Sequence, residues 1–101
     1  MALMEITIVP MGTGSTSCSP YIARVLDIAK ADPHVTYQLN PMGTVLEGSL
    51  SDLYHCLQNM QETLFDDGIQ RVYTVVKIDD RRDKYQNMTQ RIQSVEEKQH
   101  D

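Results

Sequence analysis

A tight turn in the middle of the chain constrains the fold more than any other feature of the sequence. The segment TYQLNPMGTVLEG, residues 36–48, places Asn, Pro, Met and Gly in the order that a type I turn favours. Side chains after the turn alternate between two faces, as they do in strands. The segment therefore predicts a β-hairpin with strands over 35–39 and 44–48. Its second strand carries one carboxylate, Glu47.

The segments on either side of the hairpin show one pattern, in which a strand is joined to a helix. Apolar residues alternate in strands and recur every three or four positions in helices. The expected elements are a strand over 4–9, a helix over 20–31 capped by Ser19, the hairpin, a helix that is capped by Ser51 or Asp52 and ends at Gly68, a strand over 69–78, and a last helix with an apolar seam at Tyr85, Met88, Ile92 and Val95. This order predicts an α+β fold, a ferredoxin-like β-α-β-β-α-β sandwich with an extra C-terminal helix, in a single domain over residues 1–101.

The order of elements also predicts how the strands are arranged. Right-handed connections place the first and third strands side by side in the centre, and we expect them to be parallel. The tetrapeptide Pro-Met-Gly-Thr occurs at 10–13 and again at 41–44. Parallel strands would put these two copies at opposite ends of the sheet, so we expect no shared pocket.

Composition excludes several classes of partner. The net charge is -5, which argues against nucleic acid and anionic membranes, since both require a basic surface. The sequence shows no membrane-spanning run and no signal peptide, so we expect a cytoplasmic protein. The two cysteines have no CxxC spacing, the three histidines form no metal-binding motif, and no catalytic set is recognisable. We therefore expect neither metal nor cofactor, and no enzyme activity.

Two polar segments receive structural interpretations. Residues 12–17, GTGSTS, precede a helix but lack the lysine of a phosphate-binding loop, so they are interpreted as a flexible loop. Residues 79–84, DDRRDK, carry charges of both signs and are interpreted as a salt-bridge network.

With two helices on one face of the sheet, the other face is expected to be uncovered. Its predicted side chains are Thr7, Val9, Tyr37, Leu39, Val45, Glu47, Tyr73, Val75 and Lys77. An exposed apolar patch of this size usually marks an interface, so we expect a homo-oligomer, either a dimer or a tetramer.

Glu47 on this face has two interpretations. A buried carboxylate needs a cationic or hydrogen-bonding partner. The structural interpretation is an ion pair with Lys77, formed past Thr7. The functional interpretation is a ligand site, because a carboxylate among Tyr and Val side chains suits a flat, partly cationic ring that carries an amino group.

Three segments resemble a known family. VPMGTGSTSCSPYIA, YQLNPMGTVLEG and RVYTVVKIDDRRDK, with the spacing between them, are similar to the small thiamine-binding proteins related to YkoF. The resemblance implies sheet-to-sheet dimers, often tetramers, that bind thiamine or its hydroxymethylpyrimidine portion without catalysis. It also implies that Thr44 and Glu47 match the ligand-facing strand.

The resemblance leads to a specific hypothesis for the ligand site. Glu47 accepts a hydrogen bond from the aminopyrimidine, and Tyr37 or Tyr73 packs on the ring. Thr7 and Ser17 add polar contacts, whereas alternation puts Thr44 on the helix-covered face. The alternative is an oligomeric regulatory or interaction module in which self-association occupies the same face and no small molecule binds.

Overall fold

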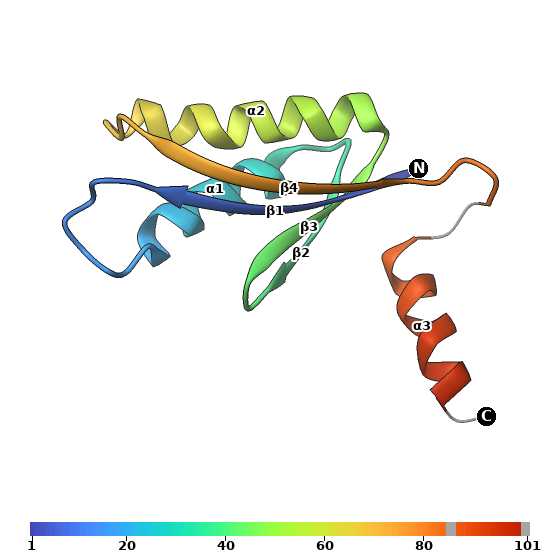
Figure 1. Ribbon diagram of the computed structural model, residues 1–101. Coiled ribbons are helices and arrows are strands. Elements are labelled where there is room, and N and C mark those ends of the chain that lie inside the picture. The colour runs from blue at the N-terminus through green and yellow to red at the C-terminus, as the bar shows by residue number, and fades with distance from the viewer. Residues whose placement is uncertain (85–86, 100–101) are drawn as a thin grey trace.

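The computed structural model describes residues 1–84 and 87–99. Its elements are β1 (Ala2–Pro10), α1 (Ser19–Ala31), β2 (Thr36–Asn40), β3 (Gly43–Gly48), α2 (Leu50–Asp66), β4 (Val72–Asp80) and α3 (Met88–Gln99). Figure 1 shows α1 and α2 beside one sheet, while α3 runs away from it on the other side. The α+β, ferredoxin-like arrangement with an extra C-terminal helix is confirmed. Tyr85, predicted as part of the α3 seam, lies outside the described residues.

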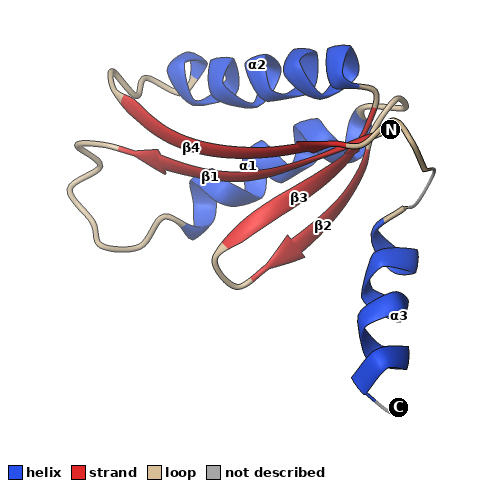
Figure 2. Ribbon diagram, turned by 45° about the vertical axis from the view of Figure 1, so that its right-hand side comes forward, coloured by secondary structure: helices blue, strands red, loops and turns tan. Residues whose placement is uncertain are grey.

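The sheet has the strand order β2-β3-β1-β4, and every neighbouring pair is antiparallel. The expectation that β1 and β3 are parallel is therefore wrong. Each helical connection passes over one strand, so β1 is parallel to β2, and β3 lies between them in the opposite direction (Figure 2). As a result, β1 ends where β3 begins. The two Pro-Met-Gly-Thr copies lie at the same end of the sheet, contrary to the prediction.

The core lies between the sheet and the two helices α1 and α2. Alternate residues of β1 point into it, beginning with Ala2, and Leu46 of β3 is completely buried. Apolar side chains of α2 at helical spacing pack against the sheet and complete the core. Its buried hydrophobic residues are Ala2, Met4, Ile6, Ile8, Val25, Ala29, Leu46, Leu53, Cys56, Met60, Leu64 and Ile69.

The hairpin turn is as tight as predicted, with only Pro41 and Met42 between β2 and β3. The Oγ1 hydroxyl of Thr7 donates to the carbonyl of Met42 at 3.1 Å, which anchors the turn to β1. At Gly43 a Cβ atom would stand 3.1 Å from the Ile6 carbonyl oxygen and 3.2 Å from Thr7 Oγ1. Glycine is therefore needed here for close approach of the hairpin to β1.

Helix and strand ends differ from the predictions in three places. The N-cap of α2 is Ser49 rather than Ser51 or Asp52, and its hydroxyl oxygen accepts from the Asp52 N–H at 3.2 Å. The N-cap position of α1 is occupied by Cys18 rather than Ser19, and no side chain caps that helix.

The third difference is the start of β4, which begins at Val72 rather than at residue 69. Ile69 instead packs in the core, and its N–H donates to the carbonyl of Leu64 at 3.1 Å. This bond belongs to the C-terminal cap of α2, so the strand forms only after the cap is complete.

Gly68 adopts the predicted left-handed conformation after α2, with φ of 91°. A Cβ atom at this position would meet nothing within 4 Å, so a substitution costs backbone strain alone. We expect Gly68→Ala to lower the free energy of unfolding by about 1 kcal/mol. Urea denaturation measures this difference. An unchanged or higher stability would contradict the assigned role of Gly68.

Candidate functional site

Strand register divides the sheet into a covered face, under α1 and α2, and an open face. Directly opposed residues of antiparallel strands point to the same side. The open face consists of Leu3, Glu5, Thr7, Val9, Thr36, Gln38, Asn40, Gly43, Val45, Glu47, Tyr73, Val75, Lys77 and Asp79.

Tyr37 and Leu39 lie on the covered face, so their predicted placement on the open face is wrong. Tyr37 is opposite Leu46 and packs against the core, while Leu39 is opposite Thr44. A two-residue turn makes positions at equal distance from it share a face, which leaves Gln38 and Asn40 on the open side. Tyr37 cannot stack on a ring held by Glu47, because the sheet lies between them.

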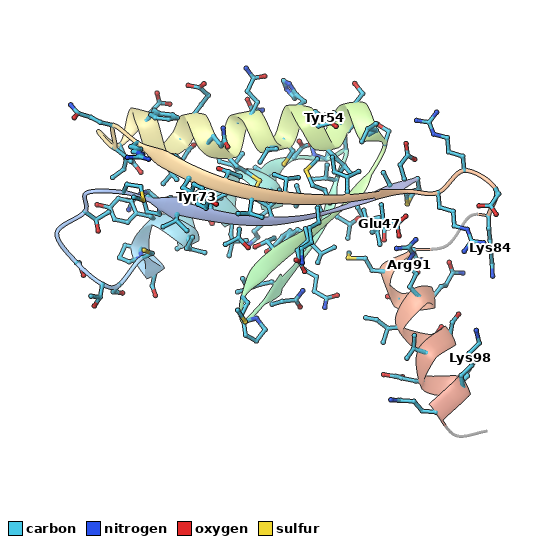
Figure 3. The ribbon with its side chains drawn as sticks, viewed as in Figure 1. Glu47, Tyr54, Tyr73, Lys84, Arg91 and Lys98 are labelled. Carbon is cyan, nitrogen blue, oxygen red and sulfur yellow. The ribbon has the colours of Figure 1, made fainter. Side chains whose placement is uncertain are left out.

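Glu47 is half-buried on the open face and is bonded to α3. Its Oε2 atom accepts the backbone N–H of Met88 at 2.7 Å. Figure 3 shows Glu47 beside the N-terminal end of α3. Asn87 and Gln90 cap the same helix end reciprocally, with bonds of 2.9 and 2.8 Å between backbone N–H and side-chain oxygen. The Glu47 carboxylate thus satisfies another free N–H and lies at the positive end of the helix dipole.

The predicted ion pair between Glu47 and Lys77 does not form. Lys77 is opposite Glu5 in the sheet, and its Nζ lies 3.7 Å from Glu5 Oε1. Glu47 is opposite Leu3, which lies two positions from Glu5 along β1. Glu47 and Lys77 are therefore not in the same row of the sheet.

An ion pair also holds α3 to the sheet, and a small hollow lies next to this helix. Arg91 Nη1 is 2.7 Å from Asp79 Oδ2. The hollow has a volume of about 190 Å³. Its walls are Leu3, Gln38, Asn40, Val45, Met88, Arg91 and Ile92. We call it the α3 hollow. Its walls combine apolar side chains with two amide groups and a guanidinium.

The other predicted site residues are not gathered around Glu47. Tyr73 is on the open face and 59% exposed, but it is opposite Val9, whereas Glu47 is opposite Leu3. Six positions along a strand separate these two rows by roughly 20 Å. Ser17 is exposed in the loop that follows β1, at the Tyr73 end of the sheet.

Thr44 is buried on the covered face, as alternation predicts, and lines a larger cavity of about 280 Å³. This hairpin-tip cavity lies between α1 and the hairpin and is mostly apolar, with walls that include Ile22 and Leu39. Sequence reasoning missed this cavity because it took β1 and β3 as parallel. That arrangement places the hairpin tip and the end of β1 at opposite ends of the sheet. Thr7 lies on the open face, yet it also borders this cavity.

The 79–84 segment forms local ion pairs, in agreement with its structural interpretation. Arg81 pairs with Asp83, and Arg82 with Asp80, each with a shortest distance of 2.7 Å. The hydrogen bond from Arg82 lowers the pKa of the Asp80 carboxyl. Among residues 1–84 and 87–99, no three His, Cys, Asp or Glu side chains are grouped to hold a metal ion. No helix in these two ranges has the length and apolar character needed to span a membrane.

Cys56 is completely buried, and burial raises the pKa of its thiol from 9.0 to about 11, with a further increase from nearby Asp32. A raised pKa favours the neutral thiol in the folded state. Its contribution to stability is therefore complete below pH 9 and is lost as the pH rises towards 11. We expect iodoacetamide at pH 8 to modify Cys18, which is partly exposed, and to spare Cys56. Peptide mass mapping checks this, and equal labelling of both thiols would contradict it.

The fold and its open face define a ferredoxin-like α+β protein, and comparison with known proteins identifies its family. The model of the family described as thiamine-binding protein matches residues 4–96. The chain belongs to this thiamine-binding protein family, as the resemblance predicted.

Individual relatives and solved structures are also similar to this chain. The UPF0045 protein YqgV of Bacillus subtilis is 43% identical over 98 residues, covering 94% of each chain. A solved structure from Methanocaldococcus jannaschii is 30% identical, with a TM-score of 0.85 over 95% of this chain and 96% of that one. A Thermotoga maritima structure whose name refers to thiamine biosynthesis or salvage is 15% identical, with a TM-score of 0.77 over 93% and 97% of the two chains. At that identity the likeness concerns the fold alone.

Proposed function

We propose that this protein binds thiamine, or its hydroxymethylpyrimidine portion, at the Glu47 end of the open face, as a homo-oligomer and without catalysing a reaction. The observation that carries the proposal is the half-buried Glu47 carboxylate beside the α3 hollow. Only Oε2 bonds to Met88, and a carboxylate has about four acceptor positions on its two oxygens. An exocyclic amino group therefore has an acceptor available beside α3.

The walls of the α3 hollow suit an aminopyrimidine. Leu3 and Val45 provide apolar contact for the flat ring. The side chains of Gln38 and Asn40 bond to each other at 3.1 Å and supply amide groups that can also bond to ring nitrogens. At about 190 Å³ the hollow is smaller than the roughly 300 Å³ at which sites for drug-sized ligands begin. It therefore suits the pyrimidine portion, with the rest of thiamine extending outside.

Titration calorimetry of the wild-type protein tests the proposal directly. We expect binding heat with thiamine and with hydroxymethylpyrimidine, because both carry the aminopyrimidine. The thiazole portion alone serves as the control and is expected to give no heat. Absence of heat with both pyrimidine compounds, at concentrations up to the millimolar range, would contradict the proposed function.

A second candidate is a regulatory or interaction module that binds no small molecule. The hydrogen bond between Glu47 and Met88 favours it, since it gives the carboxylate a structural partner. In that case Glu47→Ala would shift the oligomeric state, and pyrimidines would leave the protein unaffected. Size-exclusion chromatography with light scattering separates the two functions.

A further inference from the structure

Two carboxylates on the open face hold the first turn of α3. Glu47 accepts the Met88 N–H at 2.7 Å. Asp79 Oδ2 lies 2.7 Å from Nη1 of Arg91. In the sheet both acidic residues are directly opposite Leu3, one from β3 and the other from β4. The three residues therefore form one row across three strands, with an apolar side chain between two acidic ones.

The spacing of this row suits one turn of helix. Neighbouring strands lie about 4.8 Å apart, so the two acidic residues are separated by roughly 10 Å at the backbone. Met88 and Arg91 are on the same side of the helix, about 4.5 Å apart along its axis. The long arginine side chain covers the remaining distance, so the first turn of α3 reaches both carboxylates at once.

Little apolar burial supports this contact. None of the α3 residues Met88–Gln99 is buried, and Ile92 keeps 47% of its surface exposed. The helix is 12 residues long, and isolated helices of this length are marginal in water. The docking of α3 on the sheet therefore depends strongly on the two polar contacts.

The α3 hollow depends on the same contacts, because it lies between two elements. Its walls on the sheet are Leu3, Gln38, Asn40 and Val45, and its walls on the helix are Met88, Arg91 and Ile92. When the helix leaves the sheet, the hollow loses one of its two sides. A ligand that contacts both sides binds the docked state better than the undocked state, so ligand binding and helix docking are coupled.

We propose that Asp79 is a positioning residue for the ligand site, which raises the affinity of the α3 hollow by holding α3 in place through Arg91. Asp79 lies outside the walls of the hollow, and its side chain is 57% exposed. It therefore acts on a ligand through the helix. This inference rests on the proposed function and adds a residue that controls the site from outside it. By the same coupling, a bound ligand holds α3 on the sheet.

The neighbouring acidic residues form a different kind of contact. Asp80 pairs with Arg82. Asp83 pairs with Arg81. Each of these ion pairs joins residues two positions apart, whereas Asp79 pairs with a residue of another element. Asp83 is the matched control for Asp79, because its ion pair has the same 2.7 Å distance and does not involve α3.

The first test compares Asp79→Lys with Asp83→Lys. Both substitutions change the net charge equally at exposed side chains, so neither is expected to unfold the protein. The probe is hydroxymethylpyrimidine, which lacks the permanent positive charge of thiamine. By titration calorimetry we expect Asp79→Lys to bind it about tenfold more weakly, as a docked fraction of about one tenth requires. Asp83→Lys is expected to bind as wild type does. Equal affinities in the two variants would overturn the role of Asp79.

The salt dependence separates positioning by charge from a general loss of structure. Salt screens the attraction between Asp79 and Arg91 in wild type and the repulsion that Asp79→Lys introduces. From about 0.05 to 0.5 M NaCl we therefore expect the tenfold gap between them to shrink to about threefold or less. Asp79→Glu, which keeps the carboxylate, is expected to bind within roughly twofold of wild type. A gap that salt leaves unchanged, or a loss in Asp79→Glu equal to that in Asp79→Lys, would contradict positioning by charge.

Amide hydrogen exchange tests the docking of α3 without a ligand. The Met88 N–H is bonded to Glu47 only while the helix lies on the sheet, so its exchange rate reports docking. We expect this amide to exchange several-fold faster in Asp79→Lys than in Asp83→Lys, and hydroxymethylpyrimidine to slow it in wild type. Equal rates in the two ligand-free variants would overturn the inference. A wild-type protein that binds no pyrimidine would contradict the proposed function, while these rates would still decide whether Asp79 holds α3.

Discussion

Replacing Glu47 with glutamine is expected to weaken thiamine and hydroxymethylpyrimidine binding by about 10- to 100-fold. A hydrogen bond to a charged group contributes about 1.5–3 kcal/mol, and each 1.4 kcal/mol corresponds to a factor of ten in Kd. The glutamine oxygen can still accept the Met88 N–H, so α3 stays docked and only the charge is lost. Titration calorimetry of Glu47→Gln beside wild type measures the change.

Glu5→Gln is the matched control for this variant. Glu5 is on the same open face, two positions along β1 from the Glu47 row, and its nearest cation is Lys77 at 3.7 Å. Neither carboxylate forms a wall of the α3 hollow, but Glu47 bonds to Met88, which is one of its walls, whereas Glu5 pairs with Lys77. We expect the affinity of Glu5→Gln to match wild type. Equal losses in both variants would mean that net charge, rather than the Glu47 site, attracts the ligand.

Leu46→Ala is expected to lower the free energy of unfolding by about 2–5 kcal/mol. The Leu46 side chain is completely buried between β3 and the two helices, so its removal loses apolar burial and leaves a cavity. A domain of this size has roughly 5–15 kcal/mol in total, so the loss is a large part of its stability. Urea denaturation followed by circular dichroism measures it.

The control for Leu46 is Leu39→Ala in the neighbouring strand of the hairpin. Leu39 is on the same covered face but is 57% exposed. We expect it to cost less than about 1 kcal/mol, because little of its apolar surface is buried. A Leu39 variant as unstable as the Leu46 variant would show that the core extends to the hairpin tip.

Most of the fold could be predicted because local signals agree with one another. The alternation in β1 and the helical spacing in α2 identify their buried faces correctly. Gly68 shows where α2 ends. The face of β2 was predicted wrongly, although the tight turn itself implies that Leu39 pairs with Thr44. Alternation alone does not say which phase is buried, and the register across the turn supplies that information.

The candidate site was less predictable, because its geometry depends on contacts that are distant in the chain. Glu47 was identified as a residue needing a partner, and that partner is the Met88 N–H, 41 positions away. A backbone donor has no sequence signature of its own. The Asn87 and Gln90 capping pair marks the helix end that supplies it, and this signal could have located the N-terminus of α3.

Two polar residues of the α3 hollow, Gln38 and Asn40, were missed because β2 was assigned the wrong face. The same error misplaced Tyr37. Once β2 is in its observed register, Gln38 and Asn40 point to the open face beside Val45 and Gly43. They replace Tyr37 as the side chains that β2 offers to a ligand.

Native mass spectrometry of the freshly purified protein, before and after addition of thiamine, tests the central claim most directly. The claim is that the open face of each subunit in a homo-oligomer holds an aminopyrimidine at Glu47. The expected spectrum shows a dimer or tetramer with one thiamine-sized mass increment per subunit, and a smaller bound fraction for Glu47→Gln at the same thiamine concentration. A protein that stays monomeric and gains no mass at saturating thiamine would contradict the account.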